Sequence, residues 1–250
     1  MGGDRTKTLL QGRSNVRLIQ AAQGIENKKQ YKNQATVIVI PTLKMIPVPV
    51  VAAWFSLLHP SMQRMSGPNF FDGFEVAEAY NRAIDVILEQ KPLASFQFVL
   101  TMEHDNIPPR DGLLRLLESI DGGVDGNVYD CVGGLYWNRP QTAAEVSPLI
   151  FGNPEETPRT FFVQVPKEDA IQPCNGMGMG FTLFRLKMFR EGKIAKPYFE
   201  SIQELTEDGN LITQSQDIAF FSKACDAGYK MAVDTRVRVG HMDPESGKVW

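Results

Sequence analysis

Two carboxylates stand two residues apart where an apolar stretch of the sequence ends. Residues 96–102 are rich in β-forming side chains, as in a buried strand, and Glu103, His104 and Asp105 follow. Side chains two apart on an extended chain point the same way, so Glu103 and Asp105 can be presented together. Paired carboxylates at the carboxyl end of a strand suit Mg²⁺ or Mn²⁺. An acidic turn that only solubilises the strand end is the alternative interpretation.

A third acidic residue, Asp217, falls in the first turn of a helix predicted over residues 215–227. Ser215 is the expected N-cap and Gly228 the expected end of this helix. The helix dipole favours an ionised Asp217 at neutral pH, which a general base requires. A carboxylate that only complements the dipole is the alternative.

His241 comes directly after an alternating strand predicted over residues 231–239, and Gly240 eases the turn between them. Imidazole is a suitable supplementary ligand for Mn²⁺. The chain has only 3 histidines, and two of them adjoin the motifs described here. His241 is therefore a candidate metal ligand, with an ordinary surface histidine as the alternative.

The glycine-rich segment 174–181 invites comparison with nucleotide-binding loops. It does not match the dinucleotide fingerprint, because Leu183 stands where a third glycine is needed, and it lacks the Lys-Ser/Thr pair of a Walker loop. Gly178 and Gly180 would instead allow close approach of the backbone to a substrate, or form a flexible turn.

The order of the predicted elements favours an α/β fold. A short apolar strand at residues 36–42 fits a parallel strand buried on both faces. The other expected elements are a helix within 48–58, a Gly/Pro-rich loop at 66–69, a helix over 75–90, the strand 96–102, a helix opened by Pro109 and a strand over 129–136. This alternation predicts a sheet flanked by helices.

The chain is expected to form one large domain over residues 35–250, preceded by a polar basic extension or linker at 1–34. Residues 138–175 hold six prolines and are interpreted as an insertion forming the far wall of a cleft, with a hairpin near 161–165.

The net charge of −3 argues against a strongly basic nucleic-acid binder. The charge is uneven, with +5 on residues 1–34 and −8 on the rest, so the extension could touch a polyanion or remain solvated.

Three cysteines without zinc-type spacing favour a reducing compartment. With no signal-peptide pattern and no apolar stretch long enough to span a membrane, the sequence predicts a cytoplasmic protein.

Together these motifs resemble a GT-A fold glycosyltransferase, close to the large family 2 of inverting enzymes, over residues 36–243. Segment by segment, the resemblance comprises the opening strand (37–42), the RN-x-A helix (80–84), the Asp-x-Asp metal motif (98–105), the next strand (131–134), the glycine-rich acceptor segment (178–185), the Glu-Asp pair with the base (215–217) and the AGYK…GH ending (227–241).

The resemblance implies a GT-A (nucleotide-diphospho-sugar transferase) fold with a mixed, mostly parallel sheet flanked by helices. It implies Asp217 as catalytic base, and Asp105, Glu103 and His241 as ligands of Mn²⁺ or Mg²⁺. The remaining implied contacts are Pro41, Thr42, Arg82, Glu103, His104 and Asp105 for the donor, and Gly178, Gly180 and Gln216 on the acceptor side. The sequence departs from the family at Glu103, which replaces Asp, and at Ser215-Gln216, which replace the acid before the base. Asp72 is a candidate for reading the nucleotide base.

The expected activity is metal-dependent transfer of a sugar, with inversion, from a nucleotide-diphospho-sugar to an acceptor hydroxyl. The acceptor stays open among a glycan, a small molecule, a protein and a hydroxylated DNA base. One alternative is a nucleotidyltransferase that makes sugar nucleotides, although the Gly-x-Gly-x-Arg opening expected there is missing. Another is a non-catalytic nucleotide-sugar or glycan binding protein.

Overall fold

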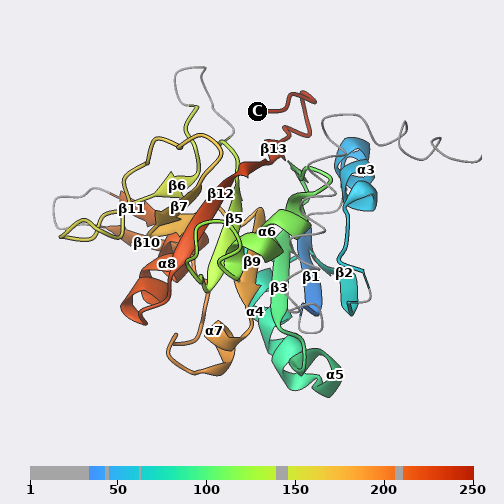
Figure 1. Cartoon of the computed structure of the whole chain (residues 1–250), viewed down its shortest axis with the longest axis horizontal. Helices are drawn as coiled ribbons and strands as arrows, with labels where there is room; N and C mark the ends of the chain where they lie inside the picture. The colour runs from blue at the N-terminus through green and yellow to red at the C-terminus, as the bar shows by residue number, and fades with distance from the viewer. Residues whose placement is uncertain (1–33, 43–44, 62, 139–145, 206–210) are drawn as a thin grey trace, which may run out of the picture.

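The computed structural model describes residues 34–42, 45–61, 63–138, 146–205 and 211–250 (Figure 1). The predicted extension at 1–34 therefore lies, apart from Gln34, outside the described residues. The central sheet has seven strands in the order β2-β1-β3-β9-β5-β12-β7. Its strands are β1 (Thr36–Thr42), β2 (Met65–Asp72), β3 (Phe98–Met102), β5 (Cys131–Leu135), β7 (Ile171–Cys174), β9 (Phe181–Arg185) and β12 (Met231–Arg238).

The sheet is mixed. The pairs β2–β1, β1–β3 and β5–β12 are parallel, while β9 is antiparallel to both β3 and β5, and β7 is antiparallel to β12. Five strands thus run in one direction, and only β9 and β7 oppose them. This confirms the predicted mixed, mostly parallel sheet flanked by helices.

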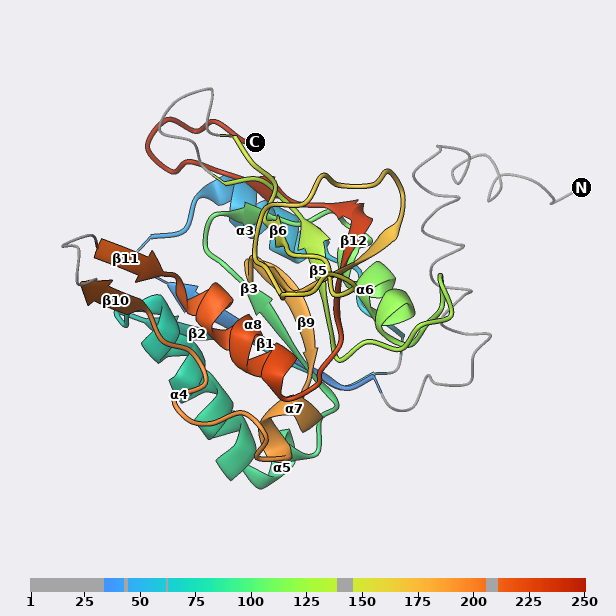
Figure 2. The ribbon, with the colours of Figure 1, turned by 90° about the vertical axis from the view of Figure 1, so that its left-hand side faces the viewer.

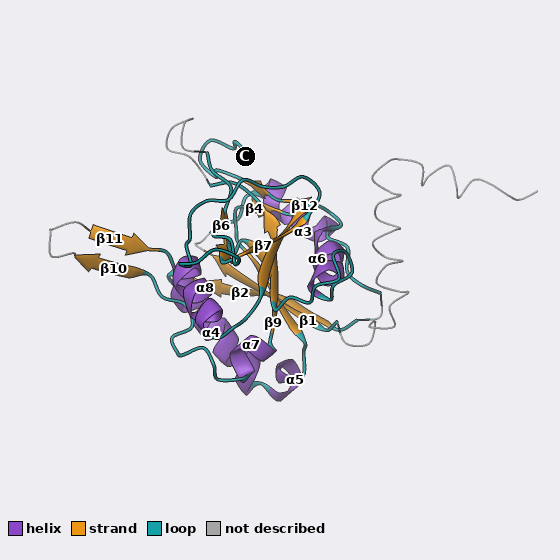
Figure 3. Ribbon diagram, turned by 60° about the vertical axis from the view of Figure 1, so that its left-hand side comes forward, coloured by secondary structure: helices purple, strands orange, loops and turns teal. Residues whose placement is uncertain are grey.

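Helices cover both faces of the sheet (Figure 3). On β1, Val37 and Val39 face a core that includes residues of α4, α7 and α8, whereas Ile38 and Ile40 face a core that includes residues of α6. This burial on both faces confirms the prediction for residues 36–42. The helices are α3 (Val48–Ser56), α4 (Val76–Glu89), α5 (Lys91–Ala94), α6 (Gly112–Ile120), α7 (Lys187–Arg190) and α8 (Gln216–Asp226).

Three two-stranded pairs complete the described structure. One of them, β10–β11, projects beside α4 and α8 (Figure 2) and leads directly into α8. The pairs are β4 (Asn106–Ile107) with β13 (Gly240–His241), β6 (Ile150–Phe151) with β8 (Gly176–Met177), and β10 (Ile202–Leu205) with β11 (Leu211–Gln214).

The predicted loop at residues 66–69 is wrong, because these residues belong to the edge strand β2. Pro68 has no N–H to donate to a ladder, but an edge strand tolerates a proline where its register is irregular. The register shifts there, between Val37 and Val39 of β1. Asn69 Nδ2 donates to the Ile38 carbonyl at 2.9 Å and so satisfies a backbone acceptor at the irregularity.

The hairpin predicted near residues 161–165 is present as one arm of a longer antiparallel pairing, in which Val163 lies opposite Phe151. Its partner is the β6 region, with Gly152 N donating to Phe162 O at 2.7 Å and Gln164 N donating to Ile150 O at 2.9 Å. The Pro-rich segment then supplies the edge strand β7. All three cysteines are free, which agrees with the predicted lack of a disulfide framework. Within the described residues, no helix is long and apolar enough to cross a membrane.

Candidate active site

The carboxyl ends of the first parallel strands meet at one edge of the sheet. Pro41 and Thr42 are buried at the end of β1, and Thr42 is the register partner of Asp72 at the end of β2. Thr42 Oγ1 donates to Asp72 Oδ1 at 3.3 Å. The next parallel strand, β3, ends at Met102, so the acidic pair begins at the same edge. Parallel strands therefore bring the predicted donor-binding residues Pro41 and Thr42 towards that pair.

Glu103 is held against helix α4. Its backbone N–H donates to Gly180 O at 3.0 Å, and its Oε1 accepts from the Tyr80 hydroxyl at 3.1 Å. Burial raises the pKa of Glu103 to about 7, with the charges of Asp105 and Asp217 adding to the rise and the Tyr80 hydrogen bond opposing it. Glu103 thus faces Tyr80 on one side of the sheet edge.

Asp105 lies beside His241. Strand β13 pairs with β4 so that His241 is opposite Asn106, and Met242 N donates to Asp105 O at 2.8 Å. This pairing leaves Asp105 only 4% exposed and places its Oδ2 3.4 Å from His241 Nε2. Residues far apart in the sequence are therefore neighbours, as the candidate metal site requires.

The His241 ring is fixed by two contacts. Its Nδ1 lies 2.7 Å from the Trp137 carbonyl oxygen, which can only accept, so the proton sits on Nδ1. Tyr136 meets the ring edge-on, with 5.6 Å between centroids. In the neutral ring Nε2 then presents a lone pair towards the Asp105 carboxylate. A proton or a cation is needed between two such groups, and metal-bound histidines are oriented in this way by a carbonyl on the other nitrogen.

Asp217 opens α8, as predicted, and lies close enough to Glu103 for its charge to act on that carboxyl group. Its charge contributes to the raised pKa values of Glu103, Tyr80 and Tyr136. Its Oδ1 accepts from Ser215 Oγ and, at 3.0 Å, from Ile218 N. Ser215 occupies the N-cap position, but the predicted capping bond is absent in the described structure because the hydroxyl donates to Asp217 instead.

The effect of the helix on Asp217 differs from the prediction. The dipole was expected to favour the ionised form, but burial raises the pKa of Asp217, and the two hydrogen bonds only partly offset this rise. A raised pKa brings the carboxylate closer to the operating pH, which improves a general base.

Gly178 and Gly180 are buried, and the protein's own side chains fill the space beside them. A Cβ on Gly178 would lie 2.3 Å from the Tyr136 hydroxyl, and one on Gly180 would lie 2.0 Å from Asn106 Oδ1. The Tyr136 hydroxyl also accepts from Gly180 N at 2.7 Å. The close approach predicted for these glycines is therefore made by Tyr136 and Asn106.

Gly180→Ala should lower the free energy of unfolding by about 1–3 kcal/mol, since its methyl group would force Asn106 and the Tyr136 hydroxyl to move. Gly176→Ala is the matched control, because its Cβ would meet Phe161 at 3.2 Å, a milder contact. Denaturant titration of both variants measures the difference. Equal stability of the two would contradict this account of Gly180.

Arg82 is not brought to the acidic pair. It lies on the exposed side of α4, ion-paired with Glu78 at 2.7 Å and placed over the Phe74 ring at 4.3 Å. Tyr80, two positions earlier and so on another face of the helix, reaches Glu103 instead. His104 is half-buried beside Asp105, and Gln216 is half-buried as the first residue of α8.

Three residues of the site were missed by sequence reasoning. Tyr80 and Tyr136 counted only as apolar positions of predicted elements, yet both contact the cluster. Asn106 follows Asp105 directly and is fully buried, and its side-chain amide has no hydrogen-bond partner in the described part of the chain. The available signal was the run of polar residues continuing past Asp105 into Asn106.

Glu103→Gln should make the metal-free protein more stable at neutral pH. The folded pKa of about 7 lies above the ordinary value of 4.5, so the favourable contribution of protonated Glu103 is complete below pH 4.5 and is lost as pH rises to about 7. The loss amounts to roughly 3 kcal/mol at most. Glutamine cannot ionise and avoids it.

Melting temperatures measured in a chelator across pH 4–9 test this. The gain of Glu103→Gln over the unmodified chain should grow between pH 4.5 and 7 and then level off. Glu89→Gln, at an exposed glutamate at the end of α4, is the control for loss of a surface charge. A gain that is the same at every pH would refute the raised pKa.

Comparisons with known proteins give a fold but no family. Neither the protein-family models nor the curated proteins contain a match to the chain. Among solved structures, the chain is similar to the crystal structure of A197 from STIV, with a TM-score of 0.56 and 16% sequence identity over 86% of this chain and 92% of that one. Such a likeness supports the mixed α/β architecture and carries no statement about activity.

Proposed function

We propose that the protein is a metal-dependent glycosyltransferase that moves a sugar from a nucleotide-diphospho-sugar to an acceptor hydroxyl with inversion. The observation that carries this proposal is the pairing of Asp105 Oδ2 with His241 Nε2, 3.4 Å apart, in a cluster that also includes Asp217. A cation ligand pair and a separate, half-buried carboxylate are the groups that this chemistry needs.

The residues present suit a divalent cation whose remaining ligands come from the substrate. In the described residues, no cluster of three or more His, Cys, Asp or Glu side chains could hold a metal ion alone. Asp105 and His241 supply one carboxylate and one imidazole, and Mg²⁺-type sites with one or two protein ligands take the rest from substrate phosphates and water. Bound there, the cation would neutralise the negative charge that grows on the departing diphosphate.

Asp217 is proposed to take the proton of the acceptor hydroxyl. The acceptor oxygen forms a bond to the anomeric carbon while the bond from that carbon to the diphosphate breaks, which inverts the centre. Ser215 Oγ and Ile218 N both bind Oδ1 of Asp217, which orients the carboxylate and leaves Oδ2 for the acceptor. The raised pKa of Asp217 suits this role.

Glu103 is assigned to the donor rather than to the cation. Its Oε1 is held by Tyr80, which directs the carboxyl group towards α4 instead of towards His241. A carboxylate in this position can bind a hydroxyl of the donor ribose. Tyr80 would then act as a positioning residue.

Incubation with UDP-, GDP- and dTDP-sugars and Mn²⁺, without acceptor, tests the proposal. We expect slow release of nucleoside diphosphate from one donor class, abolished by a chelator, because water can replace the acceptor. Pyrophosphate-dependent exchange would instead indicate a nucleotidyltransferase. Binding of a sugar nucleotide without any turnover, in the presence of Mn²⁺ and an acceptor panel, would indicate a non-catalytic binding protein.

A further inference from the structure

The chain beyond β13 folds back along that strand (Figure 1). His241 N donates to Trp250 O at 3.0 Å, and Trp250 N donates to His241 O at 3.1 Å. Met242 lies opposite Val249 in the same antiparallel arrangement. Residues 241–250 therefore form a hairpin, which we call the 241–250 hairpin. Strand β13 is thus paired with β4 on one side and with the second half of this hairpin on the other.

The turn of the 241–250 hairpin is held by its own residues. The side chain of Asp243 accepts from Glu245 N at 3.1 Å and from Ser246 Oγ at 2.5 Å, and Gly247 N donates to Asp243 O at 2.8 Å. Gly247 has a φ of 72°, a conformation that favours glycine. The turn therefore brings the residues that follow it back to His241 in one defined register.

Lys248 and Trp250 lie on the same face of the hairpin as His241. Residues that exchange both backbone hydrogen bonds across an antiparallel pair direct their side chains to the same side, so Trp250 accompanies His241. Lys248 is two residues before Trp250 and shares its side of the strand. The Lys248 Nζ lies 4.5 Å from the centroid of the Trp250 ring, which agrees with this arrangement. On the same face, His241 Nε2 is directed towards Asp105, so Lys248 and Trp250 stand beside the proposed cation site.

The proposed cation site carries an excess of negative charge. Asp105 lies against His241, Asp217 acts on the same group of residues, and the diphosphate of a donor adds further negative charge. A single divalent cation cannot neutralise all of these groups. Because unpaired charge in a largely buried site is costly, a basic side chain is expected close to the diphosphate.

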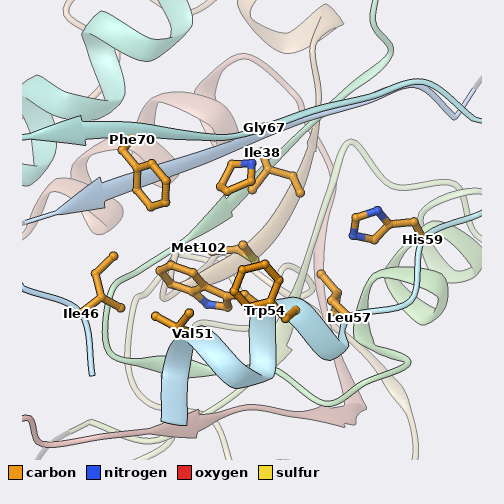
Figure 4. Close-up of a pocket in the computed structure, with 11 residues that line it drawn as sticks. Ile38, Ile46, Val51, Trp54, Leu57, His59, Gly67, Phe70 and Met102 are labelled. Carbon is orange, nitrogen blue, oxygen red and sulfur yellow. The ribbon is translucent and has the colours of Figure 1, made fainter. Parts of the chain in front are cut away.

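Two other elements beside the acidic pair do not supply this basic side chain. Arg82 of α4 is ion-paired with Glu78 on the exposed side of the helix. A pocket between α3 and the sheet, which Met102 lines directly before Glu103, has neither Lys nor Arg among its described lining residues (Figure 4). Lys248, in contrast, is exposed and makes no ion pair with the described residues.

We propose that Lys248 binds the diphosphate of the donor and that Trp250 is a positioning residue, which holds the ammonium group on the His241 face of the hairpin. This inference rests on the proposed transferase function and names a residue that neutralises the diphosphate together with the cation. An ammonium group has three donors and binds phosphate oxygens as a compact charge. Attraction between the ammonium group and the indole ring restricts the positions that Lys248 adopts.

Calorimetric titration of the full chain with pyrophosphate, UDP, GDP and dTDP, each with Mn²⁺, tests the role of Lys248. Lys248→Gln should weaken binding by about tenfold or more, as expected for loss of a hydrogen bond from a charged group. Lys248→Arg keeps the charge and should stay within about threefold of the unmodified chain. Lys193→Gln is the matched control, because Lys193 is also an exposed lysine over an aromatic ring, 5.4 Å from the Tyr229 centroid. Lys193 follows α7 at the opposite edge of the sheet, so its replacement should leave binding unchanged.

The role of Trp250 is tested through Lys248. Trp250→Leu should weaken binding of the same probes by about two- to fivefold, the usual contribution of a cation–π contact, and Trp250→Phe should restore most of the loss. In a Lys248→Gln background, Trp250→Leu should have no further effect. An equal loss with and without Lys248 would show that Trp250 supports the fold of the hairpin and does not act through Lys248.

The same titrations separate this inference from the proposed function. Normal binding to folded Lys248→Gln, together with weak binding to Asp105→Asn, would overturn the role of Lys248 and leave the cation site in place. Absence of Mn²⁺-dependent binding of all four probes to the unmodified chain would overturn both proposals. Melting curves confirm that each variant is folded.

Discussion

Replacing Asp217 with Asn should reduce sugar transfer by about 10²–10⁴-fold, the usual contribution of a general base. Asparagine keeps the shape of the side chain and can still accept from Ile218 N, so the start of α8 should not change. Donor affinity should therefore stay within about twofold, because Asp217 is assigned to the acceptor and not to the nucleotide. Initial rates and nucleotide titrations on the same preparation separate the two effects.

The matched control is Asp226→Asn at the opposite end of α8. Asp226 is an exposed carboxylate paired with Arg159 at 2.7 Å, and its replacement removes the same charge from the same helix without touching the cluster. Its transfer rate should be unchanged. If Asp217→Asn transfers sugar at the normal rate when acceptor is present, Asp217 is not the base.

Replacing Asp105 with Asn should weaken binding of Mn²⁺ in the presence of nucleoside diphosphate by about a hundredfold or more. Loss of a hydrogen-bond partner of a metal ligand already costs 10–100-fold, and loss of the charged ligand should cost at least as much. The increase in melting temperature caused by Mn²⁺ and UDP or GDP gives a direct measure, because a ligand that binds only the folded state raises stability by mass action.

Glu103→Gln provides the comparison for Asp105→Asn. Glu103 faces Tyr80, so its replacement should change the affinity for Mn²⁺ by less than about fivefold. An equal loss in both variants, with the affinity of Glu103→Gln for UDP or GDP in a chelator unchanged, would show that Glu103 is a metal ligand after all. Unchanged binding in Asp105→Asn would place the cation elsewhere.

Local sequence patterns predicted most of the fold. The apolar stretch at residues 36–42 predicted β1, and the helical spacing over 75–90 predicted α4. Both predictions succeeded because the pattern of apolar residues within each segment is enough to define the element and its buried side chains. The edge strand β2 could not be predicted in this way. The local sequence around Pro68 predicts a loop, and residues 65–72 form a strand only because they pair with β1.

The sequence predicted which residues form the candidate site better than it predicted which of them contact one another. Asp105 and His241 stand at predicted strand ends, and the structure brings them together. The side of α4 that reaches the site was not predictable, because spacing along a helix does not reveal which neighbour a face will meet. The resemblance pointed to Arg82, but Tyr80 contacts Glu103. The direction of the pKa shift of Asp217 is set by burial, and the position of a residue at a helix start does not reveal how deeply it is buried.

The two-residue pairing of β4 with β13 sets an order of events during synthesis of the chain. Asp105 leaves the ribosome long before His241, and their contact exists only once β13 has returned to lie against β4. A nascent chain that has already folded β1 and β3 therefore still lacks half of the proposed cation site. Capture of the cation therefore requires the β4–β13 pairing, so cation binding should report that folding of this sheet edge is complete.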